Sequence, residues 1–423
     1  PIYGTGQGSG NSPQIWCIIS SILFDCHAER AHGATFESPD RSESVTLYMI
    51  GFVDDTTSSV NEFFSNTQPD PEILVGKMRH DAQLWNDLLW SSGGALELPK
   101  CSYHYLHYDF TPNGSPILRP GRIGPNLVIL TGDRKGQQVI PAMSAYKAHK
   151  TLGHYKAPAG NETQQILVLR KQSDLLALQA ETASLSRREA WTFYFSMYLT
   201  SVGYPLQNCH IQRKDLDRIQ RRAVNSIISK CGFNRNMHRS IVYGPALYNG
   251  AGFRHLSTVQ GERQVTSLIR NIRHGGNPGR MQRIAISWCQ LMAGTGTSIF
   301  RDVDTPLPHL ETKWIPSVRG FLKSIQAWLE LDEDYVPPKQ RQHDSYIMDY
   351  VLRSNKFKPW EIRLINYCRM YLQCHTVSEI TLADGIQIDA GMMRGFPSLL
   401  SSTTKWHQVY QERPAEPSWT VWR

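Results

Sequence analysis

Apolar and polar side chains alternate along residues 45–53, beginning with Val45. A period of two is typical of a β-strand, because successive side chains point to opposite faces of a sheet. The segment ends in the adjacent carboxylates Asp54 and Asp55, and the Thr and Ser residues that follow are typical of a turn. We therefore expect a β-hairpin with two acidic side chains at its tip.

Helical spacing is found on both sides of this hairpin. Ser12 is a favourable N-cap and Pro13 a favourable first helical residue. Apolar residues then recur every three or four positions as far as Cys26, and Gly33 supplies a stop signal. A second helix is predicted over residues 71–90.

The remaining elements follow from the same two periods. Strands are predicted at 103–110, 127–130 and 137–140, and a loop at 114–125. From residue 162 onward the spacing is mainly helical, with helices predicted at 166–182, 188–199, 214–231, 257–273, 282–292, 315–329, 345–353 and 359–372. Linkers are predicted at 271–280 and 302–308, and a short hairpin at 381–387.

This order of elements predicts an α+β fold in three parts. In residues 1–160 we expect an antiparallel sheet with helices on one face. Residues 161–300 are predicted to be helical and basic, and residues 301–423 to form a C-terminal helical region. A chain of 423 residues is long enough for two or three domains.

Composition excludes some classes of protein. No run of 18 apolar residues occurs, so we expect no membrane span. The 8 cysteines are scattered, and the spacing of Cys368 to Cys374 and His375 is wider than a typical zinc site, which leaves zinc binding there as the less favoured alternative. We expect reduced cysteines and an intracellular protein, in the nucleus or the cytoplasm.

Charge is unevenly distributed along the chain. Residues 1–100 contain 5 basic and 13 acidic residues, whereas residues 210–290 contain 14 basic and 3 acidic residues. An acidic part followed by a strongly basic part suits an enzyme that acts on nucleic acid. A merely polar, solvated surface is the alternative.

The basic part contains an amphipathic helix. Leu216, Ile219, Ala223 and Ile227 share one face at helical spacing, and the opposite face carries Lys214, Arg218, Arg221 and Arg222. Such a face is often only solvated. Acidic partners are normally interspersed along a solvated face, and here we expect only Asp215 and Asp217 to offer any, which favours contact with phosphates.

Four short motifs occur in order along the first 155 residues. They are a glycine-rich stretch with Gln7, Gly8 and Ser9; the segment 51–55 with Phe52, Val53, Asp54 and Asp55; the segment 93–103 with Lys100; and Leu152 followed by Gly153. Glycine-rich loops allow close approach of the backbone to a base or a phosphate, but they are also ordinary flexible turns. An Asp-Asp pair likewise occurs in solvated turns.

The order and spacing of these motifs resemble those of the reverse transcriptases. A looser similarity to the region after the polymerase of non-LTR retrotransposons covers most of the rest of the chain. It rests on residues 216–222, on 242–245 with 250–253, and on 411–414. The resemblance implies a partial polymerase palm followed by a helical thumb. It implies template-directed nucleotidyl transfer with Mg²⁺, deoxynucleoside triphosphates, and an RNA template with a DNA primer or hybrid duplex.

The resemblance also implies roles for individual residues. Asp54 is the principal metal ligand and Asp55 the weaker one. Lys100 is a general acid toward the leaving pyrophosphate, with an ordinary surface lysine as the alternative. The other implied roles are template and nucleotide contacts by Gln7, Gly8, Ser9, Phe52 and Val53, a primer grip at Leu152 and Gly153, and backbone contacts by Lys214, Arg218, Arg221 and Arg222.

One feature of the family pattern is not found. The family's first catalytic Asp precedes the glycine-glutamine-glycine motif, and the printed sequence begins at Pro1. Asp109 and Asp133 are alternatives for a third ligand, but both lie in turn-like sequence. We therefore expect a fragment that is inactive alone. The alternatives are a non-catalytic nucleic-acid-binding remnant of a retroelement, and a domesticated scaffold without metal.

Overall fold

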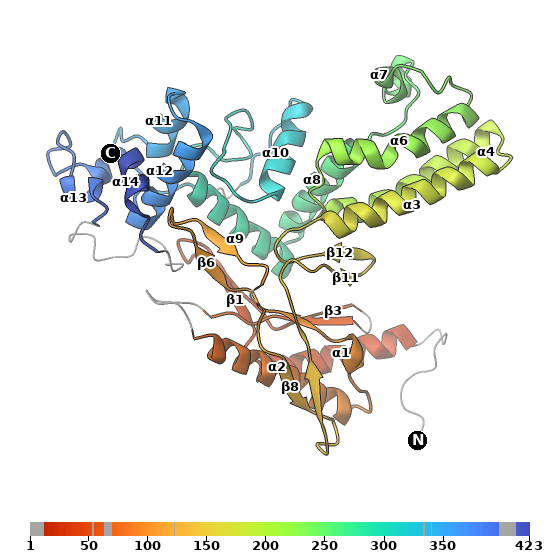
Figure 1. The fold of residues 1–423 in the computed structure, drawn as a ribbon, viewed down its shortest axis with the longest axis horizontal. Helices are drawn as coiled ribbons and strands as arrows, with labels where there is room; N and C mark the ends of the chain where they lie inside the picture. The colour runs from red at the N-terminus through yellow and green to blue at the C-terminus, as the bar shows by residue number, and fades with distance from the viewer. Residues whose placement is uncertain are drawn as a thin grey trace. The chain divides into compact units, whose positions relative to one another are not determined.

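The computed structural model describes residues 12–52, 55–62, 70–121, 123–332, 335–339, 341–396 and 412–423. Contacts divide the chain into two compact units (Figure 1). Unit 1 contains Pro1–Ala145, Gly275–Gly296 and Tyr335–Arg423, and unit 2 contains Tyr146–His274 and Thr297–Asp334. Each unit combines separate stretches of the chain, so the units cut across the sequence-based boundaries at 160 and 300.

The expected α+β composition is confirmed, because the first part of the chain contains helices and runs of consecutive short strands. The described strands pair two by two, and none of these ladders has a third strand. Five ladders are antiparallel and the β5–β10 ladder is parallel. The strands are β1 (Ala34–Glu37), β2 (Ser44–Leu47), β3 (Met49–Phe52), β4 (Asp55–Ser58), β5 (Tyr103–His104), β6 (Tyr108–Phe110), β7 (Pro116–Leu118), β8 (Leu127–Leu130), β9 (Gln137–Ile140), β10 (Ala142–Met143), β11 (His149–Thr151) and β12 (His154–Lys156).

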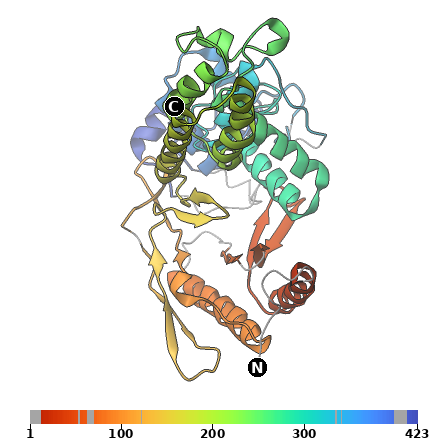
Figure 2. The same cartoon turned by 90° about the vertical axis from the view of Figure 1, so that its right-hand side faces the viewer.

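Unit 1 contains ten of these strands and several helices, of which α2, α9 and η1 contact strands. The helices are α1 (Ser12–Ala28), α2 (Pro71–Ser91), η1 (Leu98–Lys100), α9 (Gly276–Ala293), α11 (Ile347–Ser354), α12 (Pro359–Leu372), η5 (Val377–Ile380), α13 (Ala390–Met393) and α14 (Glu416–Trp422). Helix α2 lies along the β8–β9 hairpin (Figures 1 and 2). The side chains of Val75, Leu127 and Ile129 are buried between them.

Helix α1 is held to α2 by aromatic packing. Leu23 and Trp85 are buried together, and the Phe24 ring stacks on Trp85 with centroids 5.4 Å apart. The remainder of the predicted apolar stripe of α1 is not buried, since Ile19 and Ile22 are exposed. Periodicity therefore predicted this helix correctly but did not show which of its apolar positions are covered.

Helix α9 joins the β1–β2 hairpin, although more than 200 residues separate them in sequence. The Trp288 indole donates a hydrogen bond to the carbonyl of Glu37 at 2.7 Å. Arg283 forms an ion pair with Glu43 at 2.7 Å. These contacts are the reason why Gly275–Gly296 groups with unit 1 rather than with the helices that flank it in sequence.

Unit 2 is built around two helices that pack side by side, α3 (Thr163–Thr182) and α6 (Arg213–Lys230) (Figure 1). The Ser173 hydroxyl donates to the carbonyl of Ile219 at 2.7 Å between them. The other elements of unit 2 besides β11 and β12 are α4 (Arg187–Thr192), the π-helical η2 (Phe193–Tyr198), α5 (Leu199–Gly203), η3 (Tyr204–Asn208), α7 (Arg239–Val242), η4 (Ala246–Tyr248), α8 (Leu256–His274) and α10 (Trp314–Ser324).

Several predicted segments differ from the structure. The strand predicted over 103–110 forms two strands, β5 and β6, which pair with different partners, and the helix predicted over 315–329 ends at Ser324. The strand predicted over 45–53 is broken at Tyr48 into β2 and β3, which pair with β1 and β4 respectively. Alternation alone did not show this, because it contains no information about the partner strand. The predicted loop 114–125 contains β7, which pairs with β6. The predicted linker 271–280 is mostly helical, since only Gly275, with φ 73°, separates α8 from α9.

Candidate metal centre and nucleic-acid interface

The predicted hairpin with acidic residues is formed by β3 and β4. Phe52 lies opposite Asp55 at the end of the antiparallel ladder, and the Asp55 side chain is exposed. The two residues between the strands, Val53 and Asp54, lie outside the described residues, as do Gln7, Gly8 and Ser9 of the glycine-rich motif.

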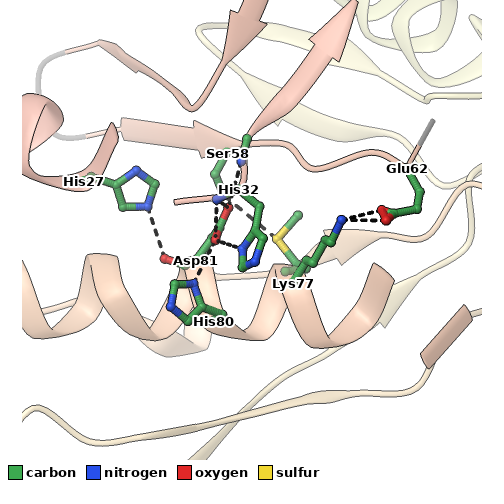
Figure 3. Close-up of polar contacts among 9 residues, drawn as sticks. His27, His32, Ser58, Glu62, Lys77, His80 and Asp81 are labelled. Carbon is green, nitrogen blue, oxygen red and sulfur yellow. Dashed lines mark hydrogen bonds and ion pairs between the residues drawn. The ribbon is translucent and has the colours of Figure 1, made fainter. Parts of the chain in front are cut away.

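The hairpin is held against α1 and α2. At Gly51 an added Cβ would come within 2.3 Å of the Phe24 ring, so the aromatic ring occupies the space where a side chain would stand. After β4 the chain is tied to α2, because Lys77 donates to the Glu62 carboxylate at 2.6 Å (Figure 3). The glycine of this motif therefore has a packing role that is separate from any contact with substrate.

The other candidate carboxylates have local partners. Asp109 accepts a hydrogen bond from Arg119 at 2.7 Å. Asp133 accepts from the Thr131 hydroxyl at 2.5 Å and from the Lys135 backbone amide at 3.1 Å, and therefore closes a turn. In the described part of the chain, Asp55 belongs to no group of three close metal-ligating side chains.

The chemistry of the described hairpin residue fits Mg²⁺. A carboxylate oxygen is the kind of ligand that this ion prefers, and an exposed position leaves room for the waters that it retains. Asp55 meets both conditions. Lys100, the predicted general acid, is exposed at the end of η1.

Leu152 and Gly153, the predicted primer grip, form the turn of the β11–β12 hairpin. Both have positive φ, 50° for Leu152 and 78° for Gly153, as a type I′ turn requires. A leucine is strained in this conformation, and its side chain remains 42% exposed. The Tyr204 hydroxyl donates to the Leu152 carbonyl at 3.2 Å and fixes the turn. The two-residue hairpin turn therefore accounts for the backbone conformation of Leu152.

A groove of about 1430 Å³ runs along α6 in unit 2. Its walls come from α6, from the start of α8, from α10 and from the segment 210–213. Five cationic side chains line it: Arg213, Lys214, Arg221, Arg239 and Lys313. Three carboxylates also line it: Glu162, Asp215 and Asp217.

The four predicted backbone-contacting residues of α6 are all exposed, but they fall into two pairs. Lys214 and Arg221 line the groove, and within the described ranges neither forms an ion pair. Arg218 is paired with Asp215 at 3.1 Å, and Arg222 with Glu181 of α3 at 2.9 Å. The expectation that only Asp215 and Asp217 offer acidic partners is wrong in this respect. Sequence analysis missed Glu181 because it lies 41 residues away.

The opposite face of α6 is as predicted. The side chains of Leu216, Ile219, Ala223 and Ile227 are all buried. Two further residues of this helix contact the first residue of α8 and the residue before it. The Gln220 side-chain carbonyl accepts from the Leu256 backbone amide at 3.0 Å, and Asp217 accepts from the His255 ring at 2.5 Å.

His255 has a defined tautomer at the groove wall. The Ser257 backbone amide donates to Nδ1 of His255 at 3.1 Å, so the ring proton lies on Nε2, which donates to Asp217. Burial lowers the pKa of His255, although hydrogen bonding to Asp217 opposes the shift.

A second group of titratable residues lies at Glu162 and His210, which also line the groove. The backbone amide of His210 donates to the Glu162 carboxylate at 3.3 Å. The side-chain amide of Gln264 donates to Nδ1 of His210 at 3.1 Å. Burial raises the pKa of Glu162. Burial, with the charges of Lys156 and Lys313, lowers the pKa of His210 to about 4. No sequence motif indicated this group, because its members come from separate elements.

The described residues also contain a group of nitrogen and oxygen ligands in unit 1. His32, His80 and Asp81 bring one ligand atom each to within 4.8 Å of one another. Figure 3 shows both imidazoles pointing at the Asp81 carboxylate. Burial raises the pKa of Asp81, but hydrogen bonds from His32, His80 and Gly33 outweigh this effect, and the pKa lies below its ordinary value. Sequence analysis missed this group, because His32 is 49 residues from Asp81.

No family model matches the chain, and neither a curated protein nor a solved structure matches it. Among the helices that the structure describes, none is both long enough and apolar enough to cross a membrane.

Proposed function

We propose that this chain is part of an RNA-directed DNA polymerase of the non-LTR retrotransposon type. In this proposal the β3–β4 hairpin presents Asp54 and Asp55 to Mg²⁺, and the groove of unit 2 binds the backbone of an RNA–DNA hybrid. When bound, Mg²⁺ supplies neutralisation of the phosphates and activation of the primer hydroxyl. Deoxynucleoside triphosphates are the substrates.

The observation that carries the proposal is the β3–β4 hairpin. Its ladder ends at the pair Phe52 and Asp55, so an exposed carboxylate lies at the end of a short antiparallel hairpin. The packing of Gly51 on Phe24 and the ion pair of Lys77 with Glu62 hold the strands on two helices. A ligand on such a supported turn can be positioned without reorganisation when the ion arrives.

The groove supports the nucleic-acid half of the proposal. Lys214 and Arg221 lie seven residues apart on α6, which is two turns or about 10.5 Å along the helix axis. Two cations at this separation, without an ion pair among the described residues, can each contact a phosphate of one backbone. Arg213, Arg239 and Lys313 extend the same positive lining.

A non-catalytic nucleic-acid-binding remnant is the second candidate. It is favoured by the observation that, among the described residues, Asp55 belongs to no group of three close metal-ligating side chains. Two-metal catalysis needs enough ligands to hold both ions. We therefore expect a chain of these 423 residues to bind hybrid duplex and not to extend a primer.

A pair of matched variants tests the groove. Lys214→Gln with Arg221→Gln removes the two groove cations, and Arg218→Gln with Arg222→Gln removes two paired cations from the same helix. The first variant should lower affinity for an RNA–DNA hybrid and reduce the slope of log affinity against log salt by about 1.8. The Arg218→Gln with Arg222→Gln variant should change the affinity and the salt slope much less. Equal losses in the two variants would indicate a response to net charge alone, and no loss in either would rule out the groove as the binding surface.

Primer extension separates the two candidate functions. The 423-residue chain is incubated with Mg²⁺, deoxynucleoside triphosphates and a primed RNA template. Extension that Asp54→Asn abolishes would establish catalysis and contradict the expected inactivity. Hybrid binding without extension supports a chain that lacks part of the metal site. Absence of both would remove the polymerase proposal.

A further inference from the structure

We propose that His32, His80 and Asp81 form a binding site for a transition-metal dication of the zinc type. The site lies in unit 1, where the loop that follows α1 meets α2. It is separate from the hairpin carboxylates and does not depend on the proposed polymerase function. Two imidazoles and one carboxylate suit Zn²⁺, whereas Mg²⁺ prefers oxygen ligands alone.

The positions of the ligand atoms are close to those of a tetrahedral site. Nδ1 of His32 lies 2.8 Å from Oδ1 of Asp81, and Nδ1 of His80 lies 3.1 Å from the same oxygen. Tetrahedral zinc with bonds of about 2.0–2.1 Å has ligand-to-ligand separations of about 3.3 Å. Small rotations of the two imidazole rings that move each Nδ1 atom by a few tenths of an ångström therefore make room for the ion.

Backbone amides orient the carboxylate. Oδ2 of Asp81 accepts from the amides of His32 at 3.1 Å and Gly33 at 3.2 Å. Oδ1 also accepts from the His32 amide at 3.0 Å. The Asp81 side chain is 0% exposed and sits on α2, so it cannot turn away. Metal-binding carboxylates are commonly fixed by such outer hydrogen bonds.

The two imidazoles remain accessible. Their side chains are 39% exposed for His32 and 52% exposed for His80, and the rings meet edge to face with centroids 4.9 Å apart. An ion can therefore enter from solvent, and a water can complete a fourth position. Binding exchanges two ring hydrogen bonds to Asp81 for two nitrogen–metal bonds. Each neutral ring then carries its proton on Nε2, where water can accept it.

The consequence of binding is a crosslink between distant segments. His32 precedes β1, and His80 and Asp81 lie in the middle of α2. In the absence of metal the Asp81 carboxylate joins them through hydrogen bonds, and the His32 and His80 rings are in contact. Metal that binds only the folded chain must raise its stability by mass action.

The experiment uses the full chain after treatment with a chelator. Zn²⁺ is titrated by calorimetry, Co²⁺ by visible absorption, and thermal melts are recorded with and without Zn²⁺. We expect one equivalent of Zn²⁺, a tetrahedral Co²⁺ spectrum and a higher melting temperature. His80→Gln should weaken binding at least tenfold, and adding His32→Gln should abolish it. His80 is half exposed, so the single variant is expected to fold, which its melt in chelator verifies.

The matched control replaces His274 and His343, two exposed histidines outside the site, with Gln. It should retain stoichiometry, affinity and the melting shift. Absence of Zn²⁺ binding to the unsubstituted chain would overturn the proposal and leave Asp81 as a hydrogen-bonded structural residue. Equal binding by the His80→Gln variant would overturn it as well. A tenfold excess of Mg²⁺ should not displace Zn²⁺, and displacement would assign the signal to oxygen ligands such as the hairpin carboxylates.

Discussion

The Phe24 ring of α1 occupies the space in front of Gly51, where an added Cβ would come within 2.3 Å of it. Phe24 is itself stacked on Trp85 of α2. Glycine at position 51 therefore lets the acidic hairpin rest on an aromatic pair that joins two helices. The packing of strand β3 on α1 depends on this contact, although neither Phe24 nor Gly51 has a reactive side chain.

Gly51→Ala should destabilise unit 1. The new methyl group would overlap a ring that the Trp85 stack holds in place, and overpacking of this kind costs about 1–3 kcal/mol. Chemical denaturation measures the change in the free energy of unfolding. Gly76→Ala is the control, because Gly76 lies inside α2 with nothing within 4 Å of its Cβ position. That substitution should stabilise by up to about 1 kcal/mol through helix propensity. If Gly51→Ala also stabilises, the close contact with Phe24 is wrong.

Leu152→Asn should raise stability and lower function. Asn tolerates positive φ better than Leu, so the strain at φ 50° is relieved by roughly 1 kcal/mol. If the exposed leucine contacts primer, affinity for the hybrid should fall while the melting temperature rises. Leu178→Asn, at an exposed position of α3, is the control and should lower stability without changing affinity. A less stable Leu152→Asn variant would argue against backbone strain at the turn.

The group at Glu162 and His210 should make stability depend on pH. Burial lowers the pKa of His210 to about 4, whereas an unfolded His titrates near 6.5. Between these values the unfolded chain binds more protons, so the free energy of unfolding falls as pH is lowered. The loss amounts to at most about 3–4 kcal/mol for this residue. His210→Gln should flatten the dependence between pH 6.5 and 4, as denaturant titrations at several pH values would show.

Glu162 provides a check on the sign. Burial raises its pKa, so the folded chain takes up a proton that the unfolded chain does not, and its contribution to stability grows as pH is lowered. Glu162→Gln should therefore steepen the loss of stability on acidification. If the free energy of unfolding depended on pH in the same way in His210→Gln and Glu162→Gln, the assigned pKa directions would be contradicted.

The buried face of α6 should carry much of the stability of unit 2. Ile219 and Ile227 are each 1% exposed, and replacing either with Ala should cost about 2–5 kcal/mol. Binding of hybrid duplex per folded molecule should be retained, because neither residue lines the groove. Denaturation curves measure the loss of stability, and salt-titrated binding on the same samples measures any loss of affinity. A loss below 1 kcal/mol would mean that the α3–α6 contact is loosely packed.

The periodicity and the terminal residues within a segment determined some of the helices and strands without reference to the rest of the chain. Pro359–Leu372, Leu127–Leu130 and Gln137–Ile140 were predicted at their observed bounds. The buried face of α6 was also predicted, because a helical period of 3.6 depends only on residues within the helix. The hairpin with acidic residues followed from alternation and turn composition for the same reason.

Tertiary structure alone decided which segments meet. The partner of β2, the covered positions of α1 and the ion pair of Arg222 with Glu181 all depend on residues far away in sequence. The ligand group of His32, His80 and Asp81 and the titratable pair of Glu162 and His210 have the same origin. Periodicity reports how one segment distributes its side chains, whereas a site requires close distances between segments, and only packing of the folded chain sets those distances.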